Sequence, residues 1–352
     1  MVFPTQKDVA RLAGVSTATV SRVVGGYGHV KESTRKKVEE AAAALGYRPN
    51  AIARSMVRRT TQTIGLIISD ISNPFFPEVV RGVEDVAHSR GYSVILCNSD
   101  EDAEKEKRYS EILLAKQVDG LIVATTTADP RHLSPLALRG VPVVLLDRDV
   151  REGSFDVVKV DNADAASRAV EHLFALGHRR VGIISGPTSI QTARERLEGY
   201  RRAHRHYNIA VDRRLIYQGD FKESGGYNGA RALMEQDDPP TAIFTANNLT
   251  TTGALAWLRE QRLRIPEDVS LVAFDDMTWM RLVEPPLTVV QQPAYLMGTT
   301  VAELLFQRLE GKVSEARQVI QLQSNLIVRG SCSAPRTSEL STRSRAGERN
   351  GR

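Results

Sequence analysis

Eight residues near the N-terminus combine small side chains, hydroxyl groups and one arginine: Val15-Ser16-Thr17-Ala18-Thr19-Val20-Ser21-Arg22. On a helix, Thr17, Ala18 and Arg22 share the outward face. There, small side chains allow close approach to base edges, and a guanidinium can grip guanine through two hydrogen bonds. The hydroxyl groups of Thr19 and Ser21 suit phosphate oxygens. This octet therefore predicts a helix that reads a groove of DNA.

Three short helices would position this octet. The apolar spacing predicts helices over 6–13, over 17–24 and from about 34 to 45. Gly14 stands where a residue with positive φ would end the first helix, and Ser16 is a natural N-cap for the second. Two helices joined by so short a turn make a helix-turn-helix, whose second helix can enter the major groove.

The charge of the chain is divided unevenly along its length. Of 352 residues, 47 are Lys or Arg and 42 are Asp or Glu, a formal net charge of +5. Residues 1–60 carry eleven basic and four acidic side chains, and residues 331–352 carry five Arg and two Glu, which leaves −5 for the middle. A basic head on an acidic body indicates a polyanionic partner at one end of the chain.

Strands alternate with helices in the middle of the chain. From residue 63, helical patterns alternate with apolar runs at 64–69, 92–97, 120–124 and 141–146, and a second series begins at residue 161. Near-continuous apolar strands joined by crossover helices indicate parallel sheets covered on both faces. We therefore predict an α/β core of two doubly wound parallel-sheet lobes, with ligand chemistry at the carboxyl ends of the strands.

Ordered motifs along the chain resemble a known family. At the head stand Asp8-Val9-Ala10-Arg11-Leu12-Ala13-Gly14-Val15-Ser16, Thr19-Val20-Ser21-Arg22-Val23 and Tyr47-Arg48-Pro49-Asn50. Further along stand Ser72-Asn73-Pro74-Phe75-Phe76, Val118-Asp119-Gly120-Leu121-Ile122, Leu176-Gly177-His178-Arg179 and Phe274-Asp275-Asp276. These motifs resemble the LacI/GalR (lactose-repressor) family of transcription regulators nearly to the end of the chain. The resemblance implies an all-α headpiece, a periplasmic-binding-protein-like core, and a homodimer that reads a palindromic operator.

Composition and the resemblance together divide the chain into four parts. We expect a helix-turn-helix DNA-binding headpiece at 1–49, a hinge helix and linker at 50–62, a two-lobed effector-binding and dimerisation core at 63–330, and a disordered basic tail at 331–352. Lobe 1 would take about 63–160 and 292–322, and lobe 2 about 161–291 and 323–330.

The DNA contacts that this reading implies extend into the hinge. The candidates are Thr5, Ser16, Thr17, Ala18, Thr19, Ser21, Arg22, Asn50, Ala53 and Met56. In proteins that the chain resembles, a leucine wedges between the central base pairs in the minor groove, and Met56 stands at that position. Since methionine is apolar and of similar volume, we expect Met56 to kink the operator. The alternative is a linker methionine without DNA contact.

Candidate effector contacts follow the predicted strands or match the family's ligand positions. They are Asn73, Phe75, Phe76, Asp147, Arg148, Arg196, Asn247, Trp279, Asp275 and Gln292. Aromatic faces suit the C–H faces of a sugar, and an arginine beside a carboxylate can hold adjacent hydroxyls or a carboxylate. The effector is therefore expected to be a sugar or a sugar acid. For each polar residue a structural strand-end hydrogen bond is the alternative, and Trp279 could equally be a core residue.

Together these patterns predict a sequence-specific DNA-binding transcriptional regulator, a repressor of carbohydrate-utilisation genes that a sugar-derived effector releases from its operator. A sugar-capture protein for transport would share the two lobes, but it would need an export signal and no helix-turn-helix. We expect a cytoplasmic protein, since the sequence holds no run of about 20 apolar residues that could span a membrane. No catalytic constellation, metal-ligand cluster or nucleotide-binding loop emerges, so neither an enzyme nor a cofactor is predicted.

Overall fold

The computed structural model describes residues 4–25, 27–47, 60–150, 155–312 and 316–336. The chain forms two compact units, Met1–Thr63 and Ile64–Arg352. Among the described residues, no helix has the length and apolar character that crossing a membrane requires.

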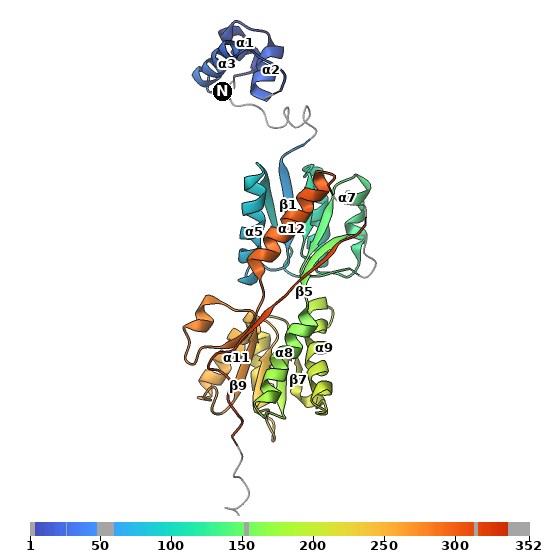
Figure 1. The fold of residues 1–352 in the computed structure, drawn as a ribbon, viewed down its shortest axis with the longest axis vertical. Coiled ribbons are helices and arrows are strands. Elements are labelled where there is room, and N and C mark those ends of the chain that lie inside the picture. The colour runs from blue at the N-terminus through green and yellow to red at the C-terminus, as the bar shows by residue number, and fades with distance from the viewer. Residues whose placement is uncertain (1–3, 26, 48–59, 151–154, 313–315, 337–352) are drawn as a thin grey trace, which may run out of the picture. The chain divides into compact units, whose positions relative to one another are not determined.

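The N-terminal unit contains three helices, α1 (Gln6–Ala13), α2 (Thr17–Gly25) and α3 (Glu32–Ala44) (Figure 1). Gly14 ends α1 with a φ of 66°, a conformation that glycine adopts without strain. The small core consists of Val9, Ala10, Val20, Val23, Val38 and Ala41. These contacts confirm the helix-turn-helix, and its helices begin and end within about two residues of the predicted bounds.

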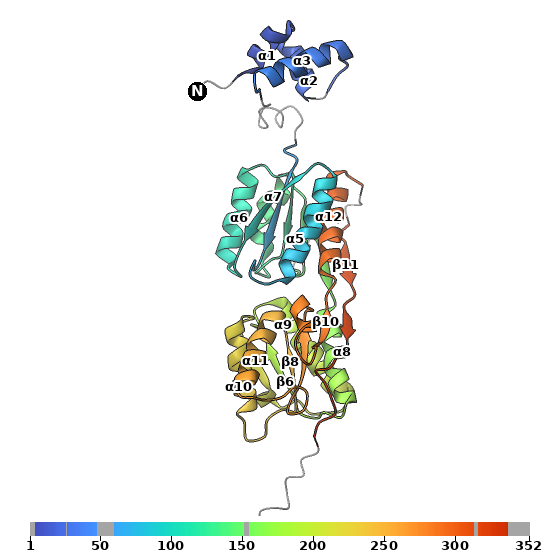
Figure 2. The ribbon, with the colours of Figure 1, turned by 90° about the vertical axis from the view of Figure 1, so that its left-hand side faces the viewer.

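Lobe 1 of the larger unit is built on a six-stranded sheet in the order β11-β5-β4-β3-β1-β2. The strands are β1 (Thr63–Ile68), β2 (Ser93–Asn98), β3 (Gly120–Val123), β4 (Val143–Leu146), β5 (Asp156–Val160) and β11 (Val319–Leu322). The helices are α5 (Phe75–Ser89), α6 (Ala103–Ala115), the short η1 (Pro130–His132) and α7 (Ser134–Leu138), and α12 (Ala294–Leu309). Ile64, Leu66 and Ile68 pack with α5 and α12, whereas Ile67 packs with α6 and α7 on the other face (Figure 2).

Lobe 2 repeats this plan with the strand order β12-β10-β9-β8-β6-β7. Its strands are β6 (Val181–Ser185), β7 (Ile216–Gln218), β8 (Ala242–Thr245), β9 (Ser270–Phe274), β10 (Thr288–Gln291) and β12 (Asn325–Ile327). Its helices are α8 (Asn162–Ala175), α9 (Gln191–His206), α10 (Glu223–Met234) and α11 (Asn248–Glu260), with short turns η2 (Arg213–Leu215) and η3 (Thr278–Arg281). Apart from the antiparallel pair of β10 and β12, its neighbouring strands run parallel. The two-lobed α/β architecture is therefore confirmed.

The chain crosses between the lobes three times, and the crossings gather on one side of the molecule. They run from β5 to α8, from β10 to α12 and from β11 to β12. The strands β11 and β12 form the edges of their sheets on this side, and the opposite edges carry β2 and β7 (Figure 2). Any hinge motion of the lobes must therefore turn about the side that holds the crossings.

The structure corrects two details of the predicted organisation. Residues 331–336 belong to lobe 2 and not to a disordered tail, because the buried Ser331 hydroxyl donates to the carbonyl of Leu271 at 2.6 Å and accepts from the amide of Thr288 at 2.8 Å. Their small polar side chains are typical of a disordered segment, yet this segment forms hydrogen bonds with the lobe 2 sheet. The helical pattern predicted between the apolar runs at 120–124 and 141–146 forms the two short helices η1 and α7 and not one continuous helix. The hinge residues Asn50, Ala53 and Met56, and residues 337–352, lie outside the described residues.

Candidate functional site

A cavity lies between the lobes, at the carboxyl ends of strands from both sheets. Lobe 1 contributes Asp70, Asn73, Phe75, Phe76, Glu101, Asp147 and Arg148. Lobe 2 contributes Thr192, Arg196, Asp220, Phe221, Lys222, Asn247 and Asp275, and Gln292 comes from the crossing after β10. Nine of the ten candidate effector residues thus line one cavity.

Trp279 is the candidate that the structure does not bring into this cavity. It lies on η3, packs partly against the lobe 2 core, and lines a neighbouring cavity together with Met277 and Arg281. The backbone leaves the strand end at Asp275, which has a φ of 77°, and η3 carries the indole away from the site. The two cavities share the side chains of Phe75, Asp275 and Gln292.

Asp147 and Arg148 follow β4 and are almost fully buried, at 5% and 6% exposure. Arg148 forms a two-pronged ion pair with Glu101, in which each guanidinium Nη–carboxylate distance is 2.6 Å. The Asp147 carboxylate makes a looser contact, with Oδ2 at 3.6 Å from Arg148 Nε. Neither Asp147 Oδ1 nor Arg148 Nε has a hydrogen-bond partner among the described residues. Two buried polar atoms at the cavity are therefore still free to bond.

The environment of Asp147 disfavours its charged form. Burial raises the pKa of Asp147 to about 6, with Asp275 and Glu195 adding to the rise and the nearby Arg148 and Arg196 opposing it. The residue also has a φ of 65°, a conformation that non-glycine residues rarely adopt. Strain and a buried charge are thus concentrated at the end of β4, as is common at ligand sites.

Arg196 on α9 is the central cation of the lobe 2 wall. Its Nε donates to Asn162 Oδ1 at 2.8 Å, and Nη1 donates to the carbonyl of Ala246 at 2.6 Å. The guanidinium carbon lies 3.7 Å from the centre of the Phe274 ring. These contacts hold the guanidinium flat on an aromatic face, in one orientation toward the cavity.

Asp275 and Gln292 join the end of β9 to the crossing. Gln292 Nε2 donates to Asp275 Oδ1 at 2.6 Å, and Asp275 Oδ2 accepts from the backbone and side-chain amides of Asn248 at 3.2 and 3.0 Å. Asn248 Nδ2 also donates to Asn73 Oδ1 of lobe 1 at 2.8 Å. The Oε1 atom of Gln292 is buried and has no hydrogen-bond partner in the part of the chain that is described.

Asn247 has a structural task as well as a place in the cavity. Its Oδ1 accepts from the amide of Thr250 at 2.8 Å and so caps α11, while its Nδ2 donates to the carbonyl of Phe221 at 3.0 Å. The structural alternative considered for this residue thus holds in part. Asn247 fixes the loop that carries Phe221 and Lys222.

Six lining residues escaped the sequence reasoning: Asp70, Glu101, Thr192, Asp220, Phe221 and Lys222. Asp70 and Glu101 follow the first two core strands, so the same strand-end argument that found Asp147 could have found them. Phe221 and Lys222 follow β7, a strand of three residues that no apolar run announces.

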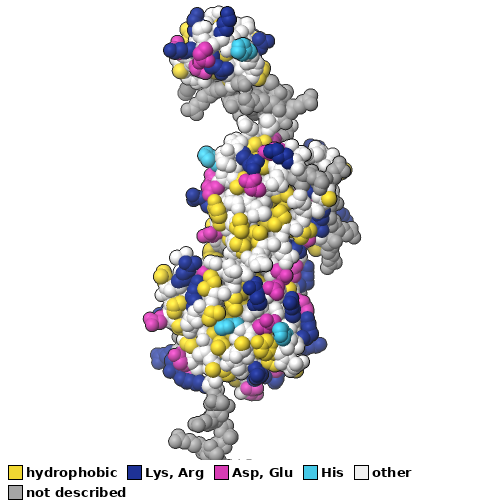
Figure 3. Space-filling view, viewed as in Figure 1, with side chains coloured by type: hydrophobic (Ala, Val, Ile, Leu, Met, Phe, Trp, Pro, Cys, Tyr) yellow, Lys and Arg dark blue, Asp and Glu magenta, His cyan; other side chains and the backbone are white. Residues whose placement is uncertain are grey.

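The headpiece exposes the side chains expected to read DNA. Thr17, Ala18 and Arg22 are exposed, whereas Val20 and Val23 are buried. Lys and Arg side chains are prominent on the visible surface of this unit (Figure 3). The predicted face of α2 is therefore free to contact a ligand.

Four other candidate DNA contacts already make local hydrogen bonds. Ser16 Oγ accepts from the amide of Thr19 at 3.1 Å, as expected of an N-cap, and lies 2.9 Å from the Thr19 hydroxyl. Ser21 Oγ lies 2.6 Å from the hydroxyl of Tyr27. Thr5 Oγ1 donates to Asp8 Oδ2 at 2.7 Å. These hydroxyls are oriented by the protein, and hydroxyl groups can make further hydrogen bonds.

Comparison with known proteins covers both units. Residues 5–50 match the family model "Bacterial regulatory proteins, lacI family", and residues 61–329 match "Periplasmic binding proteins and sugar binding domain of LacI family". The chain is 36% identical to the HTH-type transcriptional repressor PurR of Photobacterium profundum, over 93% of this chain and 98% of that protein. It is 37% identical to the ribose operon repressor of Escherichia coli K12, over 93% and 99%. The crystal structure of the Lac repressor dimer bound to operator and an anti-inducer superposes with a TM-score of 0.84 at 30% identity, over 94% and 99%.

Proposed function

Because the chain belongs to the LacI family of bacterial regulatory proteins, and is a DNA-binding transcriptional regulator and not an enzyme, we propose that it is a repressor whose operator is released when a neutral sugar binds between the lobes. The headpiece at 1–49 and hinge at 50–62 would bind DNA, and the core at 63–330 would bind the effector. A repressor acts where the genome lies, so we place it in the bacterial cytoplasm.

One observation supports the effector proposal. Buried polar atoms that can still form hydrogen bonds and aromatic rings line the same cavity. The oxygens Asp147 Oδ1 and Gln292 Oε1 can accept hydrogen bonds and Arg148 Nε can donate one. Phe75 and Phe76 pack edge to face at the start of α5, with ring centres 5.1 Å apart, and line the same space. A sugar fits such a cavity, because its hydroxyl groups can bond to the polar atoms and its C–H faces can pack on the aromatic rings.

The charges around the cavity favour a neutral sugar over a sugar acid. Five carboxylates line it against three cations: Asp70, Glu101, Asp147, Asp220 and Asp275, and Arg148, Arg196 and Lys222. Arg148 is already paired with Glu101 through both Nη atoms. The carboxylate of a sugar acid would therefore enter an acidic site, where the guanidinium of Arg148 is already occupied by Glu101. Of the sugar and sugar-acid alternatives, we propose the sugar.

A thermal-shift screen with matched pairs tests this choice. D-ribose is compared with D-ribonate, D-glucose with D-gluconate, and hypoxanthine and guanine serve as non-sugar ligands. We expect a neutral sugar to raise the midpoint of unfolding, since a ligand that binds the folded state stabilises it, while its acid does not. A larger shift with the acid, or a shift with the bases alone, would contradict the proposal.

The same ligands are then tested on DNA. The operator is replaced by a palindromic duplex that the protein itself selects from a random library. The sugar that stabilises the protein should weaken binding to this duplex, and by linkage the duplex should weaken the sugar by the same factor. Tighter DNA binding with the sugar would make it a co-repressor, contrary to the proposal.

We propose that Arg22 reads a base while the hydroxyls of α2 position the helix on phosphates. Arg22→Ala should lose about 1–3 kcal/mol of binding to the selected duplex and relax the preference at one base pair in each half-site. Arg11→Ala is the matched control, since Arg11 is an exposed arginine on α1 that pairs with Asp8. It should weaken binding slightly and leave the base preference intact. Equal base preferences in wild type and Arg22→Ala would exclude this role.

We further propose that the repressor works as a homodimer and that β2 lies in the interface. This edge strand exposes Ile95 and Leu96 at 37% and 41%. An uncovered edge strand with apolar side chains invites pairing with other chains unless a partner covers it. The Lac repressor is a dimer on its operator, which supports a second copy as the cover. Leu96→Lys should shift the protein toward monomer in analytical ultracentrifugation and weaken binding to the palindrome.

A further inference from the structure

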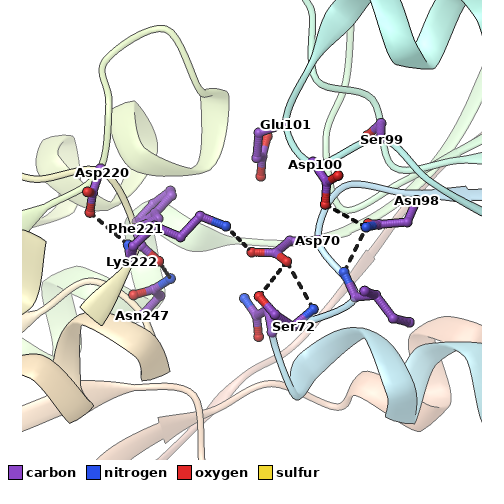
Figure 4. A network of polar contacts seen from close by, with 12 residues as sticks. Asp70, Ser72, Asn98, Ser99, Asp100, Glu101, Asp220, Phe221, Lys222 and Asn247 are labelled. Atoms are coloured by element: carbon purple, nitrogen blue, oxygen red, sulfur yellow. Dashed lines mark hydrogen bonds and ion pairs between the residues drawn. The ribbon is translucent and has the colours of Figure 1, made fainter. Parts of the chain in front are cut away.

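An ion pair joins the two lobes, and both of its partners line the cavity. Lys222 Nζ of lobe 2 contacts Asp70 Oδ2 of lobe 1 (Figure 4). The other oxygen, Asp70 Oδ1, accepts from the amide of Ser72 at 2.9 Å and from its hydroxyl at 2.6 Å. Burial raises the pKa of Asp70, but the hydrogen bonds from Lys222 and Ser72 outweigh it and hold the pKa below its usual value. Asp70 is thus an ionised, oriented acceptor with one oxygen directed across the cleft.

The loop that carries Lys222 is held in a strained shape. Phe221 has a φ of 64°, which a bulky side chain rarely adopts. Asp220 Oδ1 accepts from the amide of Lys222 at 2.8 Å, and Asn247 Nδ2 holds the carbonyl of Phe221 (Figure 4). The loop is therefore fixed on lobe 2 from both sides, and this fixed backbone extends the lysine toward lobe 1. Strain of this kind marks functional positions.

The pair lies far from the crossings about which the lobes would turn. Lys222 follows β7, the sheet edge opposite β12, and Asp70 follows β1, next to the edge strand β2. Among the described residues, other hydrogen bonds between the lobes join uncharged groups: Asn248 Nδ2 donates to Asn73 Oδ1 at 2.8 Å, and the amide of Asp149 donates to Gln191 Oε1 at 2.6 Å. When the lobes open, the groups farthest from the hinge separate most. A charged contact at this remote edge is therefore well placed to oppose opening.

We propose that Lys222 is a positioning residue of the effector site, which holds the two lobes closed over the cavity through its ion pair with Asp70. It acts through closure and not through a bond to the effector. The inference rests on the proposed function in that the cavity is an effector site, but closure itself can be measured without any effector.

The exposure of the two partners sets the size of the effect. The Lys222 side chain is 43% exposed and that of Asp70 10%, so water and salt screen the pair in part. Pairs of this kind shift an equilibrium by about 2- to 5-fold, which we expect for the ratio of open to closed molecules when the charge on Lys222 is removed.

Interlobe distances in the full-length protein test the proposal. Spin labels are placed on genetically encoded keto amino acids at Arg108 on α6 and Ala232 on α10, both exposed and on the side away from the crossings (Figure 2). This chemistry avoids Cys97 and Cys332. Double electron–electron resonance is recorded without ligand for wild type and for Lys222→Met, Lys222→Arg and Lys222→Glu. Circular dichroism and a thermal melt verify that each variant is folded.

Lys105→Met is the matched control. Lys105 is 42% exposed and pairs with Asp100, so the substitution removes an equally exposed charge, but both partners lie within lobe 1. We expect longer distances in Lys222→Met, still longer ones in Lys222→Glu, and wild-type distances in Lys222→Arg and in the control. Raising salt from 0.05 to 0.5 M should open the wild type and leave Lys222→Met unchanged. Identical distributions in wild type and Lys222→Met, or a wild type that is already open, would overturn the proposal.

A titration with D-ribose separates this proposal from the function of the cavity. If D-ribose binds, Lys222→Met should weaken it by the factor by which the closed population falls, since only the closed form holds the ligand fully. Unchanged affinity despite measured opening would overturn the positioning role. Distances that follow the expected order while D-ribose fails to bind would uphold closure by Lys222 and count against the sugar alone.

Discussion

The two lobes place polar side chains at the same ends of similar sheets, yet they use them differently. In lobe 2, Arg196 and Asn247 are held on both sides by hydrogen bonds to their neighbours, and Asp275 accepts on both oxygens. In lobe 1, Asp147 Oδ1 and Arg148 Nε lack hydrogen-bond partners among the residues described. Lobe 2 therefore presents a preset wall, while lobe 1 keeps bonding capacity for a ligand.

This difference has an energetic consequence. A buried polar atom without a partner destabilises the fold, and a buried carboxylate with a raised pKa does so while it is ionised. Asp147 meets both conditions, whereas the lobe 2 residues stabilise their own surroundings. Substitutions in the two walls should therefore both weaken effector binding but change the stability of the fold in opposite directions.

The largest effect is expected for Arg196→Met. The substitution removes a buried cation that offsets the charge of Asp147 and Asp275 and deprives Asn162 Oδ1 and the carbonyl of Ala246 of a donor. Breaking a buried charge network in this way costs about 3–5 kcal/mol. Calorimetry should show a lower midpoint of unfolding and an affinity for the screened sugar reduced by about 100-fold or more.

Arg194→Met on the same helix is the control for this prediction. Arg194 Nη1 donates to the carbonyls of Thr188 and Ser189 in the loop before α9, and its side chain does not line the cavity. Its replacement should change stability by less than about 1 kcal/mol and leave the affinity intact. Equal effects of both substitutions would contradict the claim that lobe 2 presents an effector-binding wall already oriented by its own hydrogen bonds.

Asp147→Asn should show the opposite change in stability. The amide keeps the shape but removes the buried charge, so we expect the free energy of unfolding at pH 7 to rise by about 1–3 kcal/mol. Effector affinity should fall by about 10- to 100-fold, because a charged acceptor is lost. A thermal melt and a sugar titration of the same preparation measure both quantities.

The pH dependence of this gain checks its cause. Because the folded-state pKa of about 6 lies above the usual value of 3.8, the wild type takes up a proton on Asp147 before the unfolded chain does. The destabilisation by the charge is thus fully present above about pH 7 and fades as the pH falls from 6 toward 4. The advantage of Asp147→Asn should shrink over that range, and a constant advantage would point to packing instead.

The fold could be predicted from the sequence wherever an element has strong local signals. Helices with clear apolar spacing, such as α1, were located to the residue, and fully buried strands, such as β3, to within one residue. The strands β5, β7 and β10 were not predicted, because none of them holds more than two consecutive apolar residues, which is too little pattern to separate a strand from a loop. The anchoring of Ser331 depends on Leu271 and Thr288, distant residues that no local pattern connects to it.

The candidate site followed the same rule. Residues that come directly after a recognised strand, such as Asp147 and Asp275, were brought together as the strand-end argument predicts. Trp279 was predicted as either an effector contact or a core residue, and it packs partly against the lobe 2 core outside this cavity, because the turn at Asp275 and the short η3 redirect the chain. Lys222 was missed because its place depends on a strained loop and on a partner in the other lobe. Tertiary geometry decides these positions, whereas sequence spacing decides the others.

The smallest effect in this comparison is the pH dependence of effector binding. If hydroxyl groups donate to ionised Asp147, binding lowers its pKa below about 6 and releases a proton. The dissociation constant should then rise as the pH falls through 6, about tenfold from pH 7 to pH 5. Isothermal titration at both pH values, in buffers of different ionisation heat, measures the affinity and the proton together. Asp147→Asn should bind with nearly the same weak affinity at both pH values. A wild type equally insensitive to pH would mean that the free oxygen of Asp147 does not bind the effector, and lobe 1 would lose the feature that distinguishes it from lobe 2.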